Sequence, residues 1–183
     1  MVTTRGDAQR REQVLEVALG VFATFGYRKT SMDAVARAAD ISRPGLYFLF
    51  SGKEELFRET MRQALEQALR GVRAALAAPG ALDERLVAAL DAYLGRYVGT
   101  HIGEGVDALL EQSRLDSMYD DYREAFLSAL AEALDASGQP ARGVTPRQIA
   151  EVLHAAATGW KHTAADRAQY VALLTTAVTA VLR

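Results

Sequence analysis

The stretch from Thr30 to Lys53, TSMDAVARAADISRPGLYFLFSGK, indicates the fold of the chain. Small and apolar residues follow Ser31 at helical spacing, and a serine in that position can cap a helix. After an interruption at residues 40–42, the pattern predicts a second helix of about two turns, Arg43–Leu49, with Pro44 in its first turn, where a missing N–H is tolerated. Two short helices joined by a tight turn are typical of a helix-turn-helix whose second helix enters the major groove of DNA.

The apolar residues of the second helix favour this interpretation over a small helical hairpin inside an all-α core. Leu46 and Phe50, four residues apart, can cover the inner face. Tyr47 and Phe48 are then expected to face outward among basic residues. Exposed aromatic rings between cations are suited to contact with a phosphate backbone and thymine methyl groups.

The same stretch resembles the N-terminal signature of TetR-family transcriptional regulators, over roughly the first third of the chain. The residues that carry the resemblance are Thr30, Ser31, Val35, Ala36, Ile41, Ser42, Arg43, Leu46, Tyr47, Phe50 and Lys53. Asp40 departs from the family pattern, which usually has a glycine in this turn. Aspartate tolerates a left-handed backbone better than most residues, so the turn is still expected.

We expect DNA to be bound mainly by the second helix of the motif. Arg43 is the candidate for a base edge, Gly45 allows close approach of the backbone, and Tyr47 and Lys53 are expected to hold phosphates. Lys53 is a cation at the start of a helix, where a phosphate would explain its presence. The complete set of expected DNA-binding residues is Thr30, Ser31, Ser42, Arg43, Pro44, Gly45, Tyr47, Phe48 and Lys53.

Charge is distributed unevenly along the 183 residues, whose formal net charge is −2. Residues 1–53 carry +3 and the remainder carries −5, so the asymmetry has the sign that DNA binding requires. There is no cysteine, which excludes disulfides and thiolate metal sites. Neither a signal-peptide pattern nor a run of eighteen apolar residues is present, which leads us to expect a cytoplasmic location.

Helical periodicity continues to the end of the chain and predicts an all-α protein of about nine helices. The first helix is expected at about residues 10–25, with Phe25 in its apolar stripe. A long helix at about 51–77, capped by Ser51, joins the N-terminal three-helix domain to a C-terminal helical bundle. Further helices are expected at about 82–98, 104–112, 117–136, from 146, where Thr145 and Gln148 predict a capping box, and from 167. We therefore place a DNA-binding domain at residues 1–53 and a ligand-binding and dimerisation domain at 54–183.

Aromatic residues are concentrated in the middle helices and suggest a small-molecule site. A packed core is the alternative, but each tyrosine hydroxyl needs a partner, which suits a partly apolar cavity. The resemblance to TetR-like proteins, which keep their effector pocket in this region, supports the same assignment. The expected ligand-binding residues are Tyr93, Tyr97, His101, Met118, Tyr119, Tyr122, Phe126 and Trp160.

The last two helices carry more apolar residues than one chain needs to bury, which predicts an isologous homodimer. The expected interface residues are Leu153, Ala156, Tyr170, Leu174, Ala177, Val178 and Val181. No catalytic motif or cofactor fingerprint is present, and His154 and His162 lack the spacing of metal ligands and are interpreted as ordinary polar residues. No enzymatic activity, cofactor or metal is therefore expected; a small-molecule enzyme is the third hypothesis.

Taken with the resemblance, these patterns predict a sequence-specific, dimeric transcriptional regulator, with a repressor favoured, that binds a palindromic operator and releases it when a small-molecule effector tilts the long helix. A DNA-binding dimer without a ligand is the alternative. The identity of the effector, the operator sequence and the choice between repressor and activator do not follow from the sequence.

Overall fold

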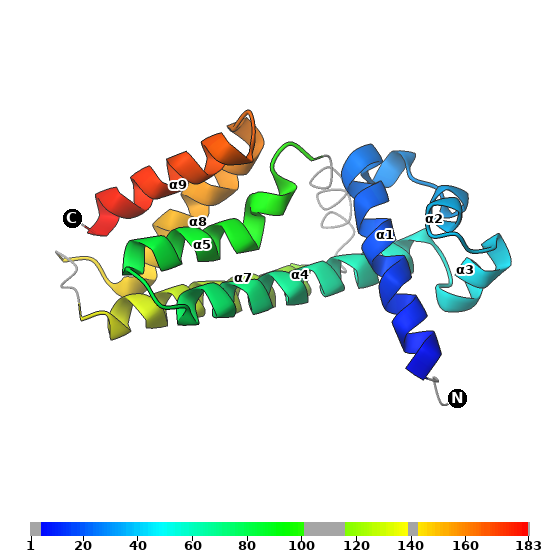
Figure 1. Cartoon of the computed structure of the whole chain (residues 1–183), viewed down its shortest axis with the longest axis horizontal. Coiled ribbons are helices and arrows are strands. Elements are labelled where there is room, and N and C mark those ends of the chain that lie inside the picture. The colour runs from blue at the N-terminus through cyan, green and yellow to red at the C-terminus, as the bar shows by residue number, and fades with distance from the viewer. Residues whose placement is uncertain (1–4, 101–115, 139–142, 183) are drawn as a thin grey trace. The chain divides into compact units, whose positions relative to one another are not determined.

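The computed structural model describes residues 5–100, 116–138 and 143–182, in which every regular element is helical (Figure 1). This part of the chain holds eight α-helices and a 3-10 turn and no strand, which confirms the predicted all-α class. The elements are α1 (Arg5–Lys29), α2 (Met32–Ala38), α3 (Arg43–Leu49), α4 (Lys53–Ala77), α5 (Leu82–Leu94), η1 (Gly95–Tyr97), α7 (Asp116–Ala136), α8 (Pro146–Thr163) and α9 (Arg167–Leu182). The helix predicted at 104–112 lies outside the described residues.

The chain divides into two compact units. Unit 1 comprises residues 1–64 and 100–116, and unit 2 comprises residues 65–99 and 117–183. Helix α4 therefore contributes its first three turns to unit 1 and the rest of its length to unit 2. The functional boundary expected at residue 53 stays a prediction. No helix in the described ranges is long and apolar enough to cross a bilayer.

Local sequence signals define the helices of unit 1. The side chains of Ser31 and Ser42 accept hydrogen bonds from the backbone N–H groups of Ala34 and Gly45, both at 3.1 Å, and so cap α2 and α3 as predicted. Asp40 has φ 52°, the left-handed conformation expected for this turn.

Two details of the helix prediction are wrong. Phe25, which was expected in the core stripe of the first helix, is 56% exposed. Periodicity predicts which face of a helix is apolar, but it does not show how far neighbouring helices cover that face. Ser51 was expected to cap the long helix, but the carbonyl of Gly52 accepts its first backbone hydrogen bond, from Leu56 N–H. The N–H and hydroxyl of Ser51 donate instead to the carboxylate of Glu55, at 2.7 and 2.6 Å.

The core of unit 1 is formed where α1, α2 and α3 pack with the start of α4. The ring of Phe22 meets Phe57 edge-on with centroids 4.8 Å apart. Leu46 is buried on the inner face of α3, and Phe50 is buried at its C-cap. The sequence interpretation therefore assigned the inner side of the second motif helix correctly, which fixes the outer side as well.

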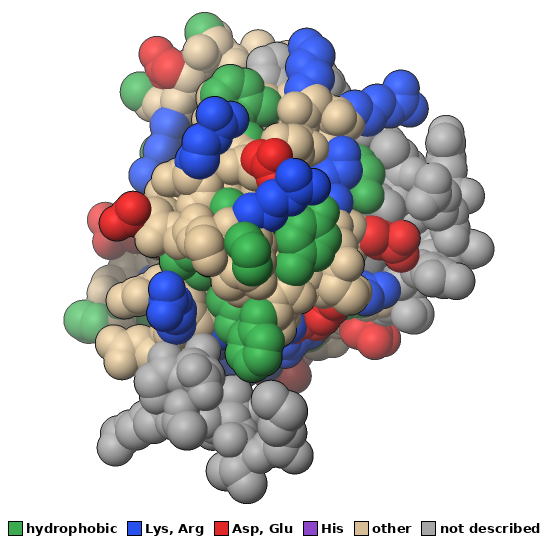
Figure 2. Space-filling model, turned by 90° about the vertical axis from the view of Figure 1, so that its right-hand side faces the viewer, with side chains coloured by type: hydrophobic (Ala, Val, Ile, Leu, Met, Phe, Trp, Pro, Cys, Tyr) green, Lys and Arg blue, Asp and Glu red, His purple; other side chains and the backbone are tan. Residues whose placement is uncertain are grey.

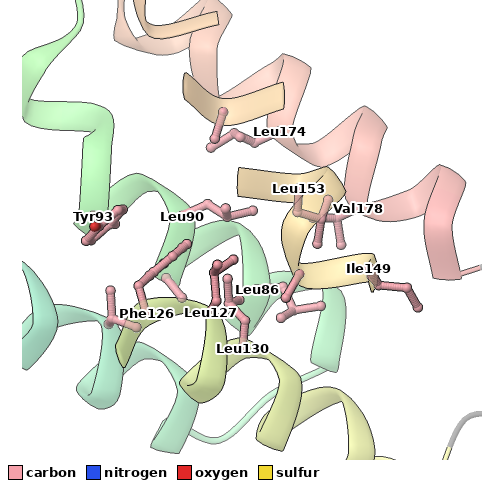
Figure 3. Close-up of a cluster of buried hydrophobic side chains, with 14 of the residues drawn as sticks. Leu86, Leu90, Tyr93, Phe126, Leu127, Leu130, Ile149, Leu153, Leu174 and Val178 are labelled. Atoms are coloured by element: carbon pink, nitrogen blue, oxygen red, sulfur yellow. The ribbon is translucent and has the colours of Figure 1, made fainter. Parts of the chain in front are cut away.

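Unit 2 is a helical bundle with a continuous apolar core (Figure 3). Tyr93 of α5 stacks on Phe126 of α7 with ring centroids 4.0 Å apart and an interplanar angle of 7°. Leu90, Leu153 and Leu174 bring α5, α8 and α9 into the same cluster, and all three are fully buried. Helix α8 starts at the predicted capping box, in which Thr145 and Gln148 satisfy each other's backbone N–H groups.

Candidate DNA interface and effector region

The outer face of α3 presents apolar rings to solvent. Tyr47 is 43% exposed and Phe48 is 72% exposed, whereas Leu46, on the inner face of the same helix, is buried. Arg43 and Pro44 are exposed at the start of the same helix. Figure 2 shows hydrophobic side chains lying among Lys and Arg side chains on the face turned to the viewer. A helix with this surface can contact both the phosphates and the base edges of a major groove.

Three of the expected contact residues hold the motif together. The Thr30 side chain is buried and its hydroxyl donates to the carbonyl of Gly26 at 2.8 Å. Ser31 and Ser42 are exposed, but their hydroxyl oxygens are engaged as helix caps. A Cβ at Gly45 would lie 3.1 Å from the Ser42 hydroxyl, so this glycine leaves room for the cap. Direct roles of these residues at DNA stay predictions.

Lys53 has protein partners that the sequence did not reveal. Its ammonium group donates to the carbonyls of Tyr27 at 3.0 Å, Arg28 at 3.4 Å and Thr30 at 3.1 Å, and lies 4.4 Å from the centroid of the Tyr27 ring. These carbonyls belong to the end of α1 and the connector after it, where a cation is favourable. Burial lowers the pKa of Lys53 and raises that of Tyr27. The lysine therefore has a structural explanation without a phosphate.

Arg43 is held by an acid that sequence reasoning missed. Its guanidinium Nε lies 3.0 Å from Oδ1 of Asp33, a residue in the first turn of α2. The Tyr47 ring centroid is 5.7 Å from the guanidinium carbon. The ten-residue separation between Asp33 and Arg43 corresponds to no helical period, so only the packing of α2 on α3 shows the pair.

The expected effector residues that the structure describes lie in unit 2, and His101 lies outside the described residues. Tyr93, Tyr97 and Phe126 are buried, and Met118, Tyr119, Tyr122 and Trp160 are half-buried. His154 of α8, which was not predicted, adds its ring to this set, with centroids 6.1 Å from Tyr93 and 5.7 Å from Phe126. His154 was treated as an ordinary polar residue because a single histidine on a helix gives no signal of its neighbours.

The hydroxyl groups of this aromatic set differ in their surroundings. Tyr122 donates to the carboxylate of Glu66 at 3.3 Å. The buried hydroxyl of Tyr119 has no hydrogen-bond partner among the described residues, and burial raises its pKa. Burial also raises the pKa of Tyr93 to about 12 and lowers that of His154. At neutral pH these groups are uncharged, so the region offers aromatic faces and neutral hydrogen-bonding groups.

The expected dimer-interface residues fall into two groups. Leu153, Tyr170, Leu174 and Val178 have no exposed surface, and we assign them to the core of unit 2. Ala156, Ala177 and Val181 are half-buried and remain candidates. The apolar and small residues that the described chain leaves exposed on α8 and α9 are Val152, Ala155, Gly159, Ala168, Ala172 and Ala180.

Comparison with known proteins identifies the helix-turn-helix. Residues 14–60 match the family model described as bacterial regulatory proteins, tetR family. The chain is 44% identical over 50 residues to the uncharacterized HTH-type transcriptional regulator YhgD of Bacillus subtilis, and 39% identical over 57 residues to the HTH-type transcriptional regulator AcrR of Shigella flexneri. These alignments cover 27% and 31% of this chain and 26% of each relative, so the chain spans about a quarter of the length of the curated relatives it matches.

Solved structures share the fold over nearly the whole chain. A TetR-family regulator from Rhodococcus sp. superposes with a TM-score of 0.73 at 21% identity, covering 96% of this chain and 100% of the other. For reduced NemR of E. coli the TM-score is 0.76 at 18% identity, covering 95% and 98%. For FadR of Bacillus subtilis in complex with stearoyl-CoA it is 0.66 at 20% identity, covering 93% and 97%.

Residues 14–60 thus resemble the DNA-binding segment of tetR-family regulatory proteins, and nearly the whole chain shares its fold with solved structures of such regulators.

Proposed function

We propose that this protein is a homodimeric transcriptional regulator that binds a palindromic DNA site and releases it when a small molecule binds unit 2. The observation that carries the proposal is the outer face of α3, where Arg43, Tyr47 and Phe48 are exposed on a helix whose inner face is sealed. An exposed aromatic pair would be unfavourable on a surface without a partner. The match of residues 14–60 to the tetR family model supports DNA as that partner.

A second copy of the chain is the proposed occupant of the exposed face of α8 and α9. Val152 is 55% exposed in the single chain, and Ala155 and Gly159 follow it at helical spacing. Small residues allow helices to approach closely across a two-fold axis, and a two-fold dimer matches a palindromic site. Val152→Glu should therefore produce a monomer in analytical ultracentrifugation. Val144→Glu changes another exposed valine, before α8, and should leave the dimer intact.

The proposed effector site is the aromatic region of unit 2. Its neutral tyrosines and His154 supply hydrogen-bonding groups, and the buried Tyr119 hydroxyl has no partner in the described part of the chain. An apolar region with a few polar groups is the usual composition of a small-molecule site. The similar FadR of Bacillus subtilis was solved with stearoyl-CoA, which supports an effector site in a protein of this fold and leaves the chemical class open.

Selection of binding sites from random double-stranded DNA tests the function directly. We expect an inverted repeat to be enriched, with half-site centres about one helical turn, roughly 34–36 Å, apart. Arg43→Ala should relax base preference and cost about 1–3 kcal/mol for each half-site. Glu132→Gln, an exposed change on α7 in unit 2, is the control and should bind as the unmodified protein does.

Failure to enrich any sequence would refute DNA recognition by α3. Effector release is tested separately by thermal-shift screening against apolar and aromatic metabolites, followed by DNA-binding titrations with each compound that raises the melting temperature. If no compound raises it and Tyr119→Phe stabilises the protein, the aromatic region is packed core. The alternative of a DNA-binding dimer without a ligand would then hold.

A further inference from the structure

Asp33 and Arg43 form an ion pair across the two helices of the helix-turn-helix, and both side chains are exposed. Nε of Arg43 lies 3.0 Å from Oδ1 of Asp33, and Nη1 lies 3.5 Å from Oδ2. An acid at this position is unexpected on a surface that meets DNA, because a carboxylate repels the phosphates that supply most non-specific affinity.

The contact restrains the orientation of the arginine side chain. The Asp33 carboxylate lies 3.0 Å from Nε and accepts a hydrogen bond from Nη1 at 3.5 Å, and the Tyr47 ring centroid lies 5.7 Å from the guanidinium carbon. A guanidinium carries five N–H donors in one rigid plane, so donors on Nη1 and Nη2 remain for another acceptor. Two such parallel donors match O6 and N7 of guanine in the major groove. An arginine without such a restraint can turn to any nearby phosphate.

We propose that Asp33 is a positioning residue for base recognition. It orients Arg43 toward a guanine, and its negative charge lowers the affinity of the motif for the phosphates of any sequence. Asp33 thus increases discrimination between DNA sequences and decreases binding to random DNA. This inference rests on the proposed function, because it requires α3 to enter a major groove.

A structural role for Asp33 gives a different expectation. The residue lies in the first turn of α2, where a carboxylate interacts favourably with the helix dipole. If that were its whole role, its removal would lower the melting temperature and reduce binding to all sequences in the same proportion. Base preference and sequence-independent affinity therefore separate the two roles.

The experiment compares the unmodified protein with Asp33→Asn, Asp33→Glu and Arg43→Ala. The DNA site selected by the unmodified protein, the same site with each guanine replaced in turn, and random DNA are titrated at several salt concentrations. Glu12→Gln is the matched control, because it removes one exposed negative charge from α1 in the same unit. Melting temperatures are measured for every variant.

For Asp33→Asn we expect discrimination at one guanine of each half-site to fall by up to about fivefold, the ratio that corresponds to a typical exposed ion pair. Affinity for random DNA should rise by up to about fivefold, as expected for removal of one unit charge near a phosphate. The salt dependence should become steeper by about 0.9 for each phosphate that Arg43 gains. Asp33→Glu should restore part of the discrimination, and Glu12→Gln should change none of it.

Unchanged base preference in Asp33→Asn would overturn the proposal, whether or not the melting temperature falls. A proportional loss of affinity for all sequences would also overturn it and would assign Asp33 to the stability of α2. If the unmodified protein selects no sequence, the proposed function itself fails. If it selects a sequence and Arg43→Ala relaxes preference but Asp33→Asn does not, only the role of Asp33 is refuted.

Discussion

Replacement of Phe48 by alanine removes the most exposed of the large hydrophobic side chains in the described part of the chain. The ring is 72% exposed on the outer face of α3, beside Tyr47 and one turn beyond Arg43. If this ring contacts a thymine methyl group in the major groove, the contact buries apolar surface on both sides. Removal of the ring from the protein and removal of the methyl group from the DNA should then weaken the same contact.

The magnitude follows from the exposed area. Full burial of a phenylalanine side chain is worth about 1.5–3 kcal/mol, so burial of the exposed part of Phe48 is worth about 1–2 kcal/mol for each half-site. A thymine methyl contributes about 0.8 kcal/mol. Replacement of that thymine by deoxyuridine in both half-sites should therefore weaken binding by about 1.6 kcal/mol, or roughly fifteenfold.

The assay is fluorescence anisotropy with a selected site and with versions that carry deoxyuridine at one thymine position at a time. At one position the substitution should weaken the unmodified protein but leave Phe48→Ala unaffected, as a double-mutant cycle requires for two groups in contact. Phe25→Ala removes another exposed phenylalanine of unit 1 and should bind as the unmodified protein does. Equal losses for the unmodified protein and Phe48→Ala at every thymine would refute the contact.

Four further predictions concern stability. Lys53→Met should lower the free energy of unfolding in urea by about 1.5–3 kcal/mol, because three carbonyls lose a charged donor; weaker DNA binding at unchanged stability would instead support a phosphate contact. Gly95→Ala should destabilise the protein by about 1–3 kcal/mol in the same assay, because its Cβ would lie 1.9 Å from Oδ1 of Asp91. In the monomeric Val152→Glu variant, Gly159→Ala, with nothing within 4 Å of the added atom in the single chain, should stabilise α8 by about 0.8–1 kcal/mol; the same gain in the unmodified protein would show that no second copy packs on this face. Burial holds the pKa of His154 below its ordinary value of 6.5, so the unfolded chain binds more protons there and stability should fall as the pH drops through that value. Thermal melts between about pH 7.5 and pH 5.5 should show a smaller decrease for His154→Gln, and equal slopes would contradict the assignment.

The helix-turn-helix could be predicted from the sequence because its determinants act over three or four residues. Ser31 and Ser42 cap the helices that follow them, and Asp40 adopts the left-handed turn that the spacing requires. The inner and outer faces of α3 were also assigned correctly, since Leu46 and Phe50 define one side of a helix by their spacing. Local hydrogen bonds and helical periodicity are properties of a short segment, so a short segment reveals them.

Periodicity also predicted an apolar stripe on the last helix, but it did not decide what that stripe contacts. Leu174 and Val178 were expected at a dimer interface, and both are fully buried in the core of the single chain. A core and an interface demand the same residue types, because both remove apolar surface from water. Only the positions of α5 and α8 beside α9 show which side chains are already covered.

The contacts that give the proposed DNA interface its chemistry were decided by tertiary structure alone. Asp33 reaches Arg43 because α2 packs on α3, and Lys53 is drawn to the carbonyls at the end of α1 rather than left at a bare helix terminus. Each cationic side chain could in principle pair with many carboxylate or carbonyl oxygens of the chain. The sequence therefore determined which residues carry charge and which helix presents them. Their distances in the folded chain determined their partners, because electrostatic attraction and hydrogen bonding depend on separation in space.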